Sequence, residues 1–260
     1  MIPLSWSALL FISSLTPMKA PLLIVDFDPI VYRAASAAEE ELDFTPEITV
    51  VTGNFRRGKQ IVEQEIENLY TKFETHRAVF FLTSSVNFRK QVEPSYKGNR
   101  IKRKPCGFKK LKEWAKTQFH CVEQEGLEAD DLIGIEVTSG KHDNFILCSP
   151  DKDMEQFPVR IGNNRQEFTQ SPEKADLKRW MQALTGDQTD GYGGCPGVGP
   201  VKAEKILSKV KDGNYYEIVR DTYIQSGLTE EDALKQIRLA TILTHDQWDY
   251  ATKKPILFTP

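Results

Sequence analysis

Short apolar runs alternate with helical patterns over the first 150 residues, and this alternation constrains the fold more than any other feature. Leu22–Val25 and Ala78–Leu82 are continuous apolar runs and Asn144–Cys148 is nearly so, which is typical of strands buried on both faces. Helices are predicted between them, from about Ile30 to Glu41 and from Gln60 to Glu74. The sequence therefore predicts an α/β fold with a mostly parallel central sheet flanked by helices.

The chain divides into three parts by this pattern. Residues 1–17 contain an apolar stretch that is too short to span a bilayer, and they are predicted to be a disordered extension. Residues 18–171 form the predicted α/β core, and residues 172–260 form a predicted helical region. Shorter elements are also predicted, with strands at 49–52 and 120–123 and helices at 109–118, 173–184, 201–210, 215–225 and 230–243.

Carboxylates occur in closely spaced sets where a predicted strand ends, where a helix begins, or in a glycine-flanked turn. Each set alone has an ordinary explanation as a polar turn or as an acidic helix start. Parallel strands end at one edge of a sheet, so the sets are expected to converge, and their repulsion then calls for divalent cations. Two Mg²⁺ ions are predicted, with Mn²⁺ as a substitute, held by Asp26, Glu128, Asp130, Asp131, Asp151, Asp153, Asp187 and Asp190.

A strongly basic segment lies in the middle of a chain whose formal net charge is −3. Residues 89–116 contain eleven Lys and Arg against two Glu, and Phe88, Tyr96 and Phe108 are interleaved with them. Such a segment is typical of a surface that binds a polyanion, with aromatic rings that stack on unpaired bases. A solvated, flexible loop is the alternative interpretation.

A glycine-rich turn follows the last pair of aspartates. Gly197 and Gly199 allow close approach of a phosphate, Pro200 fits the first turn of a helix, and Lys202 and Lys205 follow it. The run Cys195–Ala203 resembles the helix–hairpin–helix elements that hold one strand of a DNA duplex, which implies a bound K⁺ as well. An ordinary tight turn between two helices is the alternative.

Together these motifs resemble the 5′ nuclease (flap endonuclease) superfamily, and the bacteriophage 5′–3′ exonucleases most. The resemblance runs from about Pro21 to Gln225. It is carried by Ile24-Val25-Asp26, Tyr32-Arg33-Ala34, Phe88-Arg89, Tyr96–Arg100, Glu128–Asp131, Ser149–Asp153 and Thr185-Gly186-Asp187 with Asp190 and the Gly-Val-Gly-Pro turn. It implies a PIN-like nuclease core, a helical arch over about 88–117, and a helix–hairpin–helix over about 185–210.

The resemblance also implies an activity and a set of residues. The expected function is metal-dependent hydrolysis of DNA near junctions of single strand and duplex, as a 5′–3′ exonuclease or 5′ flap endonuclease, leaving 5′-phosphate and 3′-hydroxyl ends. Substrates would be DNA with a free 5′ end or flap and RNA–DNA hybrids, met by a monomer in the host cytoplasm, away from any membrane. Lys97 and Arg100 match the catalytic basic residues. The predicted DNA-binding residues are Arg33, Arg89, Tyr96, Lys102, Arg103, Lys104, Gly197, Gly199, Lys202 and Lys205.

One departure from the family pattern keeps other interpretations open. The family usually carries an aspartate just after the second strand, but Leu82–Asn87 contains no carboxylate, and Ser84 is predicted to occupy that position. A non-catalytic flap or junction DNA-binding protein of the same fold would explain this loss. Asp26-x-Asp28 also resembles haloacid-dehalogenase-type phosphatases, and a toxin-like ribonuclease would explain the acids. Neither of these two accounts for the glycine-rich turn.

Overall fold

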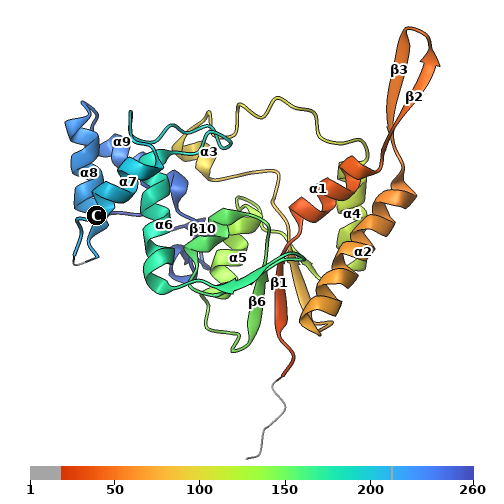
Figure 1. The fold of residues 1–260 in the computed structure, drawn as a ribbon, viewed down its shortest axis with the longest axis horizontal. Helices are drawn as coiled ribbons and strands as arrows, with labels where there is room; N and C mark the ends of the chain where they lie inside the picture. Colours follow the sequence, from red (N-terminus) through yellow and green to blue (C-terminus); the bar gives the residue numbers. More distant parts are fainter. Residues whose placement is uncertain (1–18, 212) are drawn as a thin grey trace, which may run out of the picture.

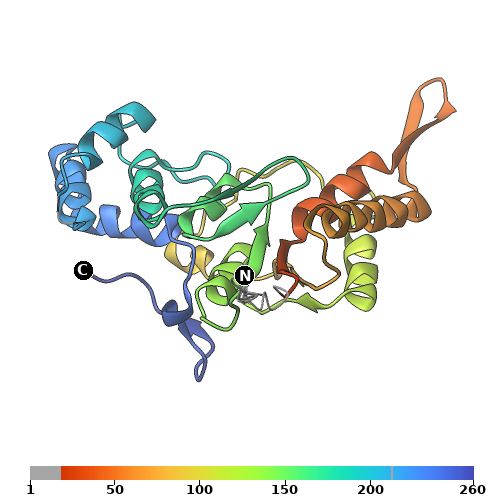
Figure 2. The same cartoon turned by 60° about the horizontal axis from the view of Figure 1, so that its bottom comes forward.

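The computed structural model describes residues 19–211 and 213–260, so the predicted extension over residues 1–17 lies outside the described residues. A central sheet lies between two groups of helices, and a long hairpin projects from the end that carries α1, α2 and α4 (Figures 1 and 2). In these described ranges, no helix combines the length and the apolar composition needed to cross a membrane.

The sheet confirms the predicted α/β architecture. Its six strands are ordered β5-β4-β1-β6-β7-β8, and every neighbouring pair is parallel except β7 with β8. Strands β7 and β8 were not predicted, because three residues are too few to show an alternating pattern. The strands are β1 Leu22–Asp26, β4 Ala78–Phe81, β5 Cys121–Val122, β6 Phe145–Cys148, β7 Arg160–Gly162 and β8 Glu167–Thr169.

Strand β1 is buried on both faces, which explains its unbroken apolar sequence. On one face Leu23 and Val25 pack with helices α1 (Asp28–Ala37), α2 (Phe55–Phe73) and α4 (Phe108–Gln118). On the other face Leu22 and Ile24 pack with α5 (Ala129–Val137) and the 3₁₀ helix η1 (Lys152–Gln156). The carboxyl ends of β1 and β6 therefore lie between two layers of helices.

The helix predicted from Ile30 to Glu41 ends earlier, at Ala37. The chain continues into β2 (Glu39–Thr45), which pairs antiparallel with β3 (Ile48–Gly53), so the prediction of a hairpin strand at 49–52 is confirmed. The hairpin is fixed at its base, where the Glu39 carboxylate accepts hydrogen bonds from the Arg103 side chain and the Cys106 backbone N–H. These contacts with the basic segment favour the strand over continued helix.

The basic segment is less helical than the resemblance implies. Helix α3 (Arg89–Val92) is short, and residues 93–107 form only turns and bends before α4 begins. Figure 1 shows this segment crossing from the C-terminal helices to α4. Pro94 and Pro105 cannot extend a helix, and Gly107 has φ of 77°. The predicted helical arch is therefore an irregular bridge between two helices.

The four helices predicted in the C-terminal region are present, but the last of them ends at Ala240 and not at Leu243. Helices α6 (Pro172–Thr185), α7 (Pro200–Leu207), α8 (Tyr215–Gln225) and α9 (Glu230–Ala240) share a core that includes Trp180, Tyr223 and Ile237. The last residues form η2 (His245–Gln247) and a small hairpin of β9 (Trp248–Asp249) and β10 (Lys254–Pro255). A helical assignment for the whole of 172–260 was wrong over this last part.

Candidate active site

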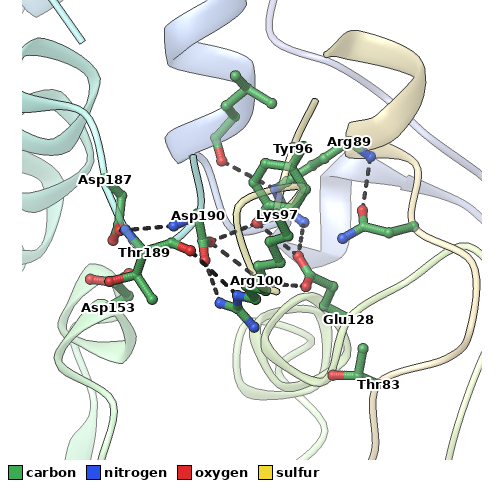
Figure 3. A network of polar contacts seen from close by, with 12 residues as sticks. Thr83, Arg89, Tyr96, Lys97, Arg100, Glu128, Asp153, Asp187, Thr189 and Asp190 are labelled. Carbon is green, nitrogen blue, oxygen red and sulfur yellow. Dashed lines mark hydrogen bonds and ion pairs between the residues drawn. The ribbon is translucent and has the colours of Figure 1, made fainter. Parts of the chain in front are cut away.

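The acidic sets lie at the carboxyl edge of the sheet or in the loop that faces it, and Figure 3 shows four members, Glu128, Asp153, Asp187 and Asp190. Asp26 is the last residue of β1, Glu128 is the N-cap of α5, and Asp151 is the N-cap of η1, just after β6. The Asp26 Oδ2 atom accepts a hydrogen bond of 2.8 Å from the Ser149 hydroxyl. The topology thus brings together carboxylates that are more than 100 residues apart in the sequence.

The predicted catalytic basic residues contact these carboxylates directly. Lys97 Nζ donates to Glu128 Oε1 and lies 3.5 Å from Asp190 Oδ2. Arg100 Nη2 donates to Asp190 Oδ1 at 2.5 Å. Figure 3 shows Lys97 and Arg100 pointing into the space between Glu128 and Asp190. Lys97 has φ of 56°, so a backbone conformation that is rare for lysine helps to direct this side chain.

The loop between α6 and α7 holds Asp187 and Asp190 through its own backbone. Asp187 Oδ1 accepts hydrogen bonds from the N–H groups of Thr189 (2.7 Å) and Asp190 (3.1 Å). The two ends of the loop meet so closely that a Cβ atom on Gly194 would lie 2.3 Å from the Gly186 nitrogen. The loop therefore presents both carboxylates from a compact, closed turn.

The structure contradicts two of the predicted assignments at Arg89 and Asp131. Arg89 is only 3% exposed, and its guanidinium donates two hydrogen bonds to Asp131, of 2.7 and 2.8 Å, and one to Glu128 of 3.2 Å. It also donates to the carbonyl oxygens of Leu239 and Thr241. Arg89 is thus a buried structural cation and does not reach DNA. Asp131 is fully buried with both oxygens on Arg89, so it is not placed to bind a metal directly.

Tyr96 is also a buried structural residue, so its predicted contact with DNA is contradicted. Its ring is 2% exposed, and its hydroxyl contacts Glu128 Oε2 at 3.0 Å and Asp190 Oδ2 at 2.8 Å. The hydroxyl connects α5 to the α6–α7 loop, and the ring is unavailable for stacking on a base. An aromatic residue between basic residues can therefore serve the protein core.

Asp153 has a carboxylate oxygen that the described residues leave unsatisfied. Its Oδ2 atom accepts a hydrogen bond of 2.9 Å from the Gln182 amide, whereas its buried Oδ1 atom has no hydrogen-bond partner in the part of the chain that the structure describes. Burial, followed by the charge of Asp151, raises the pKa of Asp153. A buried carboxylate oxygen without a partner is costly unless something positive satisfies it.

The electrostatics of the other carboxylates divide the cluster into two kinds. Burial raises the pKa of Asp26 to about 7. Burial, then the charges of Glu128 and Asp26, raise the pKa of Asp130 well above its ordinary range. Burial also acts on Glu128, but the charges of Arg89 and Lys97 outweigh it and hold the pKa at about 2. Among the described residues, Asp26 and Asp130 make no ion pair and feel Arg33 and Lys97 only at longer range, whereas Glu128 pairs directly with Arg89 and Lys97.

The donor set fits a hard divalent cation by its chemistry. Carboxylate oxygens with raised pKa values and an unsatisfied buried oxygen are the groups that Mg²⁺ or a similar ion would bind. Among the described residues, no three acidic, histidine or cysteine side chains are arranged so that they could hold a metal ion together. Glu128 and Asp190 are instead turned onto Lys97 and Arg100, so metal binding requires their side chains to reorient.

Ser84 lies after β4, where the family's aspartate is expected, and its hydroxyl forms hydrogen bonds with backbone groups. The Ser84 hydroxyl donates to the Val86 carbonyl at 2.5 Å and accepts from the Gly126 N–H at 3.3 Å. Asp28 reaches this position from α1. Its Oδ2 atom accepts a hydrogen bond of 2.7 Å from the Thr83 N–H, and its Oδ1 atom lies 3.4 Å from Lys112 Nζ. Ser84 thus shapes the loop, and Asp28 is tied to the end of β4.

Sequence patterns do not identify Gln182 or Lys112 as residues that contact the site. Gln182 lies on α6, 29 residues after the Asp153 that it contacts, and glutamines on helices are ordinary. Lys112 had been counted only as part of the basic segment. Neither residue has a distinctive neighbouring pattern, so only the packing of α6 and α4 against the site shows what they contact.

The remaining predicted DNA-binding residues are on the surface. Arg103 is bound to Glu39 of the hairpin, and Lys202 Nζ donates to the Gly197 carbonyl at 3.2 Å. Gly197 has φ of 70°, as the glycine-rich turn requires, and Gly199 is the N-cap of α7. The exposed residues of this group, whose contact with DNA stays a prediction, are Arg33, Lys102, Arg103, Lys104, Gly197, Gly199, Lys202 and Lys205.

Comparison with known proteins shows what this chain is similar to in sequence and in fold. Residues 21–177 match the model of the 5′-3′ exonuclease N-terminal resolvase-like domain. The exodeoxyribonuclease of Enterobacteria phage T3 is 29% identical, and the exonuclease of Escherichia phage T7 is 28% identical; each comparison covers 92% of this chain and 93% of the relative. The D15 protein of bacteriophage T5, crystallised with metal ions, has a similar fold with a TM-score of 0.63 at 20% identity, over 85% of this chain and 89% of that protein.

Proposed function

Because the chain belongs to the 5′–3′ exonuclease family, we propose that it is a metal-dependent 5′ nuclease that cuts DNA phosphodiesters near junctions of single strand and duplex. The products are a 5′-phosphate and a 3′-hydroxyl. The full-length similarity to the phage T3 and T7 exonucleases supports nuclease activity. The observation that carries the proposal is the meeting of Lys97 and Arg100 with two carboxylates from separate parts of the chain, Glu128 and Asp190.

The carboxylates would hold the divalent ions. Asp26, Glu128 and Asp130 belong to one group at the ends of β1 and α5, and Asp151, Asp153, Asp187 and Asp190 belong to a second group around η1 and the α6–α7 loop. Bound metal supplies activation of water and stabilisation of charge on the leaving oxygen. The unsatisfied Oδ1 of Asp153 supports a cation in the second group.

The basic residues then act on the DNA. If the carboxylates held a metal ion, Lys97 and Arg100 would be free of their present partners and could hold the phosphate that is cut. The exposed Lys102 and Lys104 continue the positive charge along the bridge toward α4. Lys202 and Lys205, with the turn at Gly197, offer a second positive surface for the duplex.

The T5 structures support the choice of ligands. One is described as a flap endonuclease in a complex with DNA and metal ions, and another as binding divalent zinc. For this chain we propose Mg²⁺ as the natural ion, with Mn²⁺ as a substitute and K⁺ at the glycine-rich turn. We extend the substrates to RNA–DNA hybrids and propose a monomer that acts in the host cytoplasm.

Cleavage of a 5′-labelled flap substrate in Mg²⁺ tests the proposal, with Asp153→Asn and Lys97→Ala beside the wild type. We expect the wild type to cut near the junction and Asp153→Asn to lose most turnover, while binding the flap normally in Ca²⁺. Lys97→Ala should lose far more turnover than duplex affinity. Flap binding without cleavage by the wild type would favour the alternative of a non-catalytic junction-binding protein.

A further inference from the structure

A cavity of about 500 Å³ opens beside Asp26 and is not explained by the carboxylate cluster. Its walls come from α1, α2, the segment after β6 and the turn between β7 and β8. Asp26 forms one part of the wall, and Arg33 and Arg165 are two further members. The cavity therefore connects a predicted metal ligand with two guanidinium groups.

The β7–β8 turn that carries Arg165 is held in a fixed shape. Asn163 Oδ1 accepts hydrogen bonds from the backbone N–H groups of Arg165 (2.9 Å) and Gln166 (3.1 Å). Lys72 of α2 reaches across and donates to the carbonyls of Asn163 (2.6 Å) and Gln166 (3.3 Å). A lysine from a different element is thus used to hold this turn against α2.

The cavity combines charged, amide and apolar groups. The Glu65 carboxylate lies 3.4 Å from Arg33 Nη2 and accepts a hydrogen bond of 3.1 Å from the Asn164 side-chain amide, so it orients both residues. The exposed amide of Asn68 also lines the cavity, and the buried side chains of Ile30 and Leu69 provide an apolar part of its wall. Guanidinium groups recognise phosphate through paired hydrogen bonds, and an apolar wall beside amides suits a nucleobase.

From this arrangement we propose that the cavity binds the 5′-terminal nucleotide of the strand being cut, with its 5′-phosphate on Arg33 and Arg165. The proposal rests on the nuclease function proposed above and adds a subsite for the released product, a deoxynucleoside 5′-monophosphate. A volume of about 500 Å³ lies within the usual range for small-ligand sites. Arg165 has no match in the motifs that carry the family resemblance.

The chemistry of the reaction agrees with this orientation. Water adds to the phosphorus, the bond from phosphorus to the 3′-oxygen of the terminal nucleotide breaks, and that oxygen leaves with a proton. The 3′-oxygen must then lie toward Asp26, at the carboxylate cluster, and the 5′-phosphate of the same nucleotide lies one sugar away. The arginines and Asp26 belong to the same cavity, as this orientation requires.

The first test compares cleavage of duplex ends that carry a 5′-phosphate or a 5′-hydroxyl. We expect the wild type to have a kcat/KM about tenfold higher for the phosphorylated end, as one charge-assisted contact would give. Arg165→Ala should reduce this ratio severalfold, because only Arg33 then remains to hold the 5′-phosphate. Arg160→Ala is the matched control, because Arg160 lies on the same hairpin, pairs with Glu167 and does not line the cavity; it should keep the wild-type ratio.

A binding measurement keeps the subsite testable apart from cleavage. Calorimetric titration of the full chain with 2′-deoxyadenosine 5′-monophosphate should show binding that Arg165→Ala weakens about tenfold and Arg160→Ala leaves unchanged. An Arg165→Ala variant that keeps both the phosphate preference and the nucleotide affinity of the wild type would overturn the proposal. A wild type that binds the nucleotide but cuts no DNA would instead contradict the proposed function alone.

Discussion

Replacement of Arg89 by methionine should destabilise the protein severely. The side chain of Arg89 is 3% exposed and donates to Asp131, to Glu128 and to two backbone carbonyls. Methionine has a similar length but no charge and no donors, so Arg89→Met leaves the fully buried Asp131 without its cation. Breaking one partner of a buried ion pair typically costs roughly 3–5 kcal/mol.

The structure indicates the upper part of this range. Glu128 keeps Lys97 as a second partner, but Asp131 has only backbone N–H groups left, from Glu128 and Leu243. For a chain of this size, a loss of 3–5 kcal/mol corresponds to a fall in Tm of roughly 6–20 °C. Urea unfolding of the metal-free protein, followed by circular dichroism, measures the free energy of unfolding directly.

Two further variants show whether the unpaired charge of Asp131 causes the loss of stability in Arg89→Met. Arg220→Ala removes an arginine from a solvent-accessible pair with Asp221 and should change the free energy of unfolding far less than Arg89→Met. The double variant Arg89→Met with Asp131→Leu removes both buried charges and should be more stable than Arg89→Met alone. A loss below about 1 kcal/mol for Arg89→Met, or no recovery in the double variant, would refute the reasoning.

Three other changes test separate parts of the structure. Asp153→Asn removes a carboxylate with an unsatisfied buried oxygen, so it should stabilise the metal-free protein by roughly 1 kcal/mol. The same variant should lose most of the rise in Tm that Mg²⁺ gives the wild type. Calorimetry with and without Mg²⁺ measures both effects. Gly194→Ala should lower the free energy of unfolding by more than about 2 kcal/mol, because the new Cβ would lie 2.3 Å from the Gly186 nitrogen and Gly194 has φ of 64°. Gly193→Ala is the control: its Cβ meets open space, so this variant should be as stable as the wild type. Equal unfolding curves for the two variants would contradict this account of the loop. Changing Lys202 and Lys205 together to Ala should reduce the salt dependence of duplex binding by about one slope unit per lost phosphate contact, and an unchanged slope in fluorescence anisotropy would show that this surface does not touch DNA.

The sequence predicted the sheet and its acidic edge well, because these depend on local patterns. Buried parallel strands need continuous apolar runs, and a carboxylate such as Asp26 at the end of a strand must lie at the edge of the sheet. Strands β7 and β8 have only three residues each, and so local pattern could not reveal them. The end of α1 was misjudged because Glu39 is held by Arg103, 64 residues later.

The site residues that were misjudged share one physical cause. Arg89 and Tyr96 belong to a basic, aromatic segment, and composition alone places such residues on a DNA-binding surface. Their burial depends on α9 and the α6–α7 loop, which supply the carbonyls of Leu239 and Thr241 and the carboxylate of Asp190. No local pattern reports that a helix 150 residues later will cover an arginine.

The pairing of Lys97 and Arg100 with Glu128 and Asp190 has a consequence for the order in which ligands bind. The same four side chains would serve the metal and the phosphate, so each ligand releases groups that the other needs. Linkage requires that if metal tightens the DNA complex by a given factor, DNA tightens the metal by that same factor. Such a protein holds its ions weakly while it is alone and firmly only when a DNA strand is in place, which confines hydrolysis to the assembled complex.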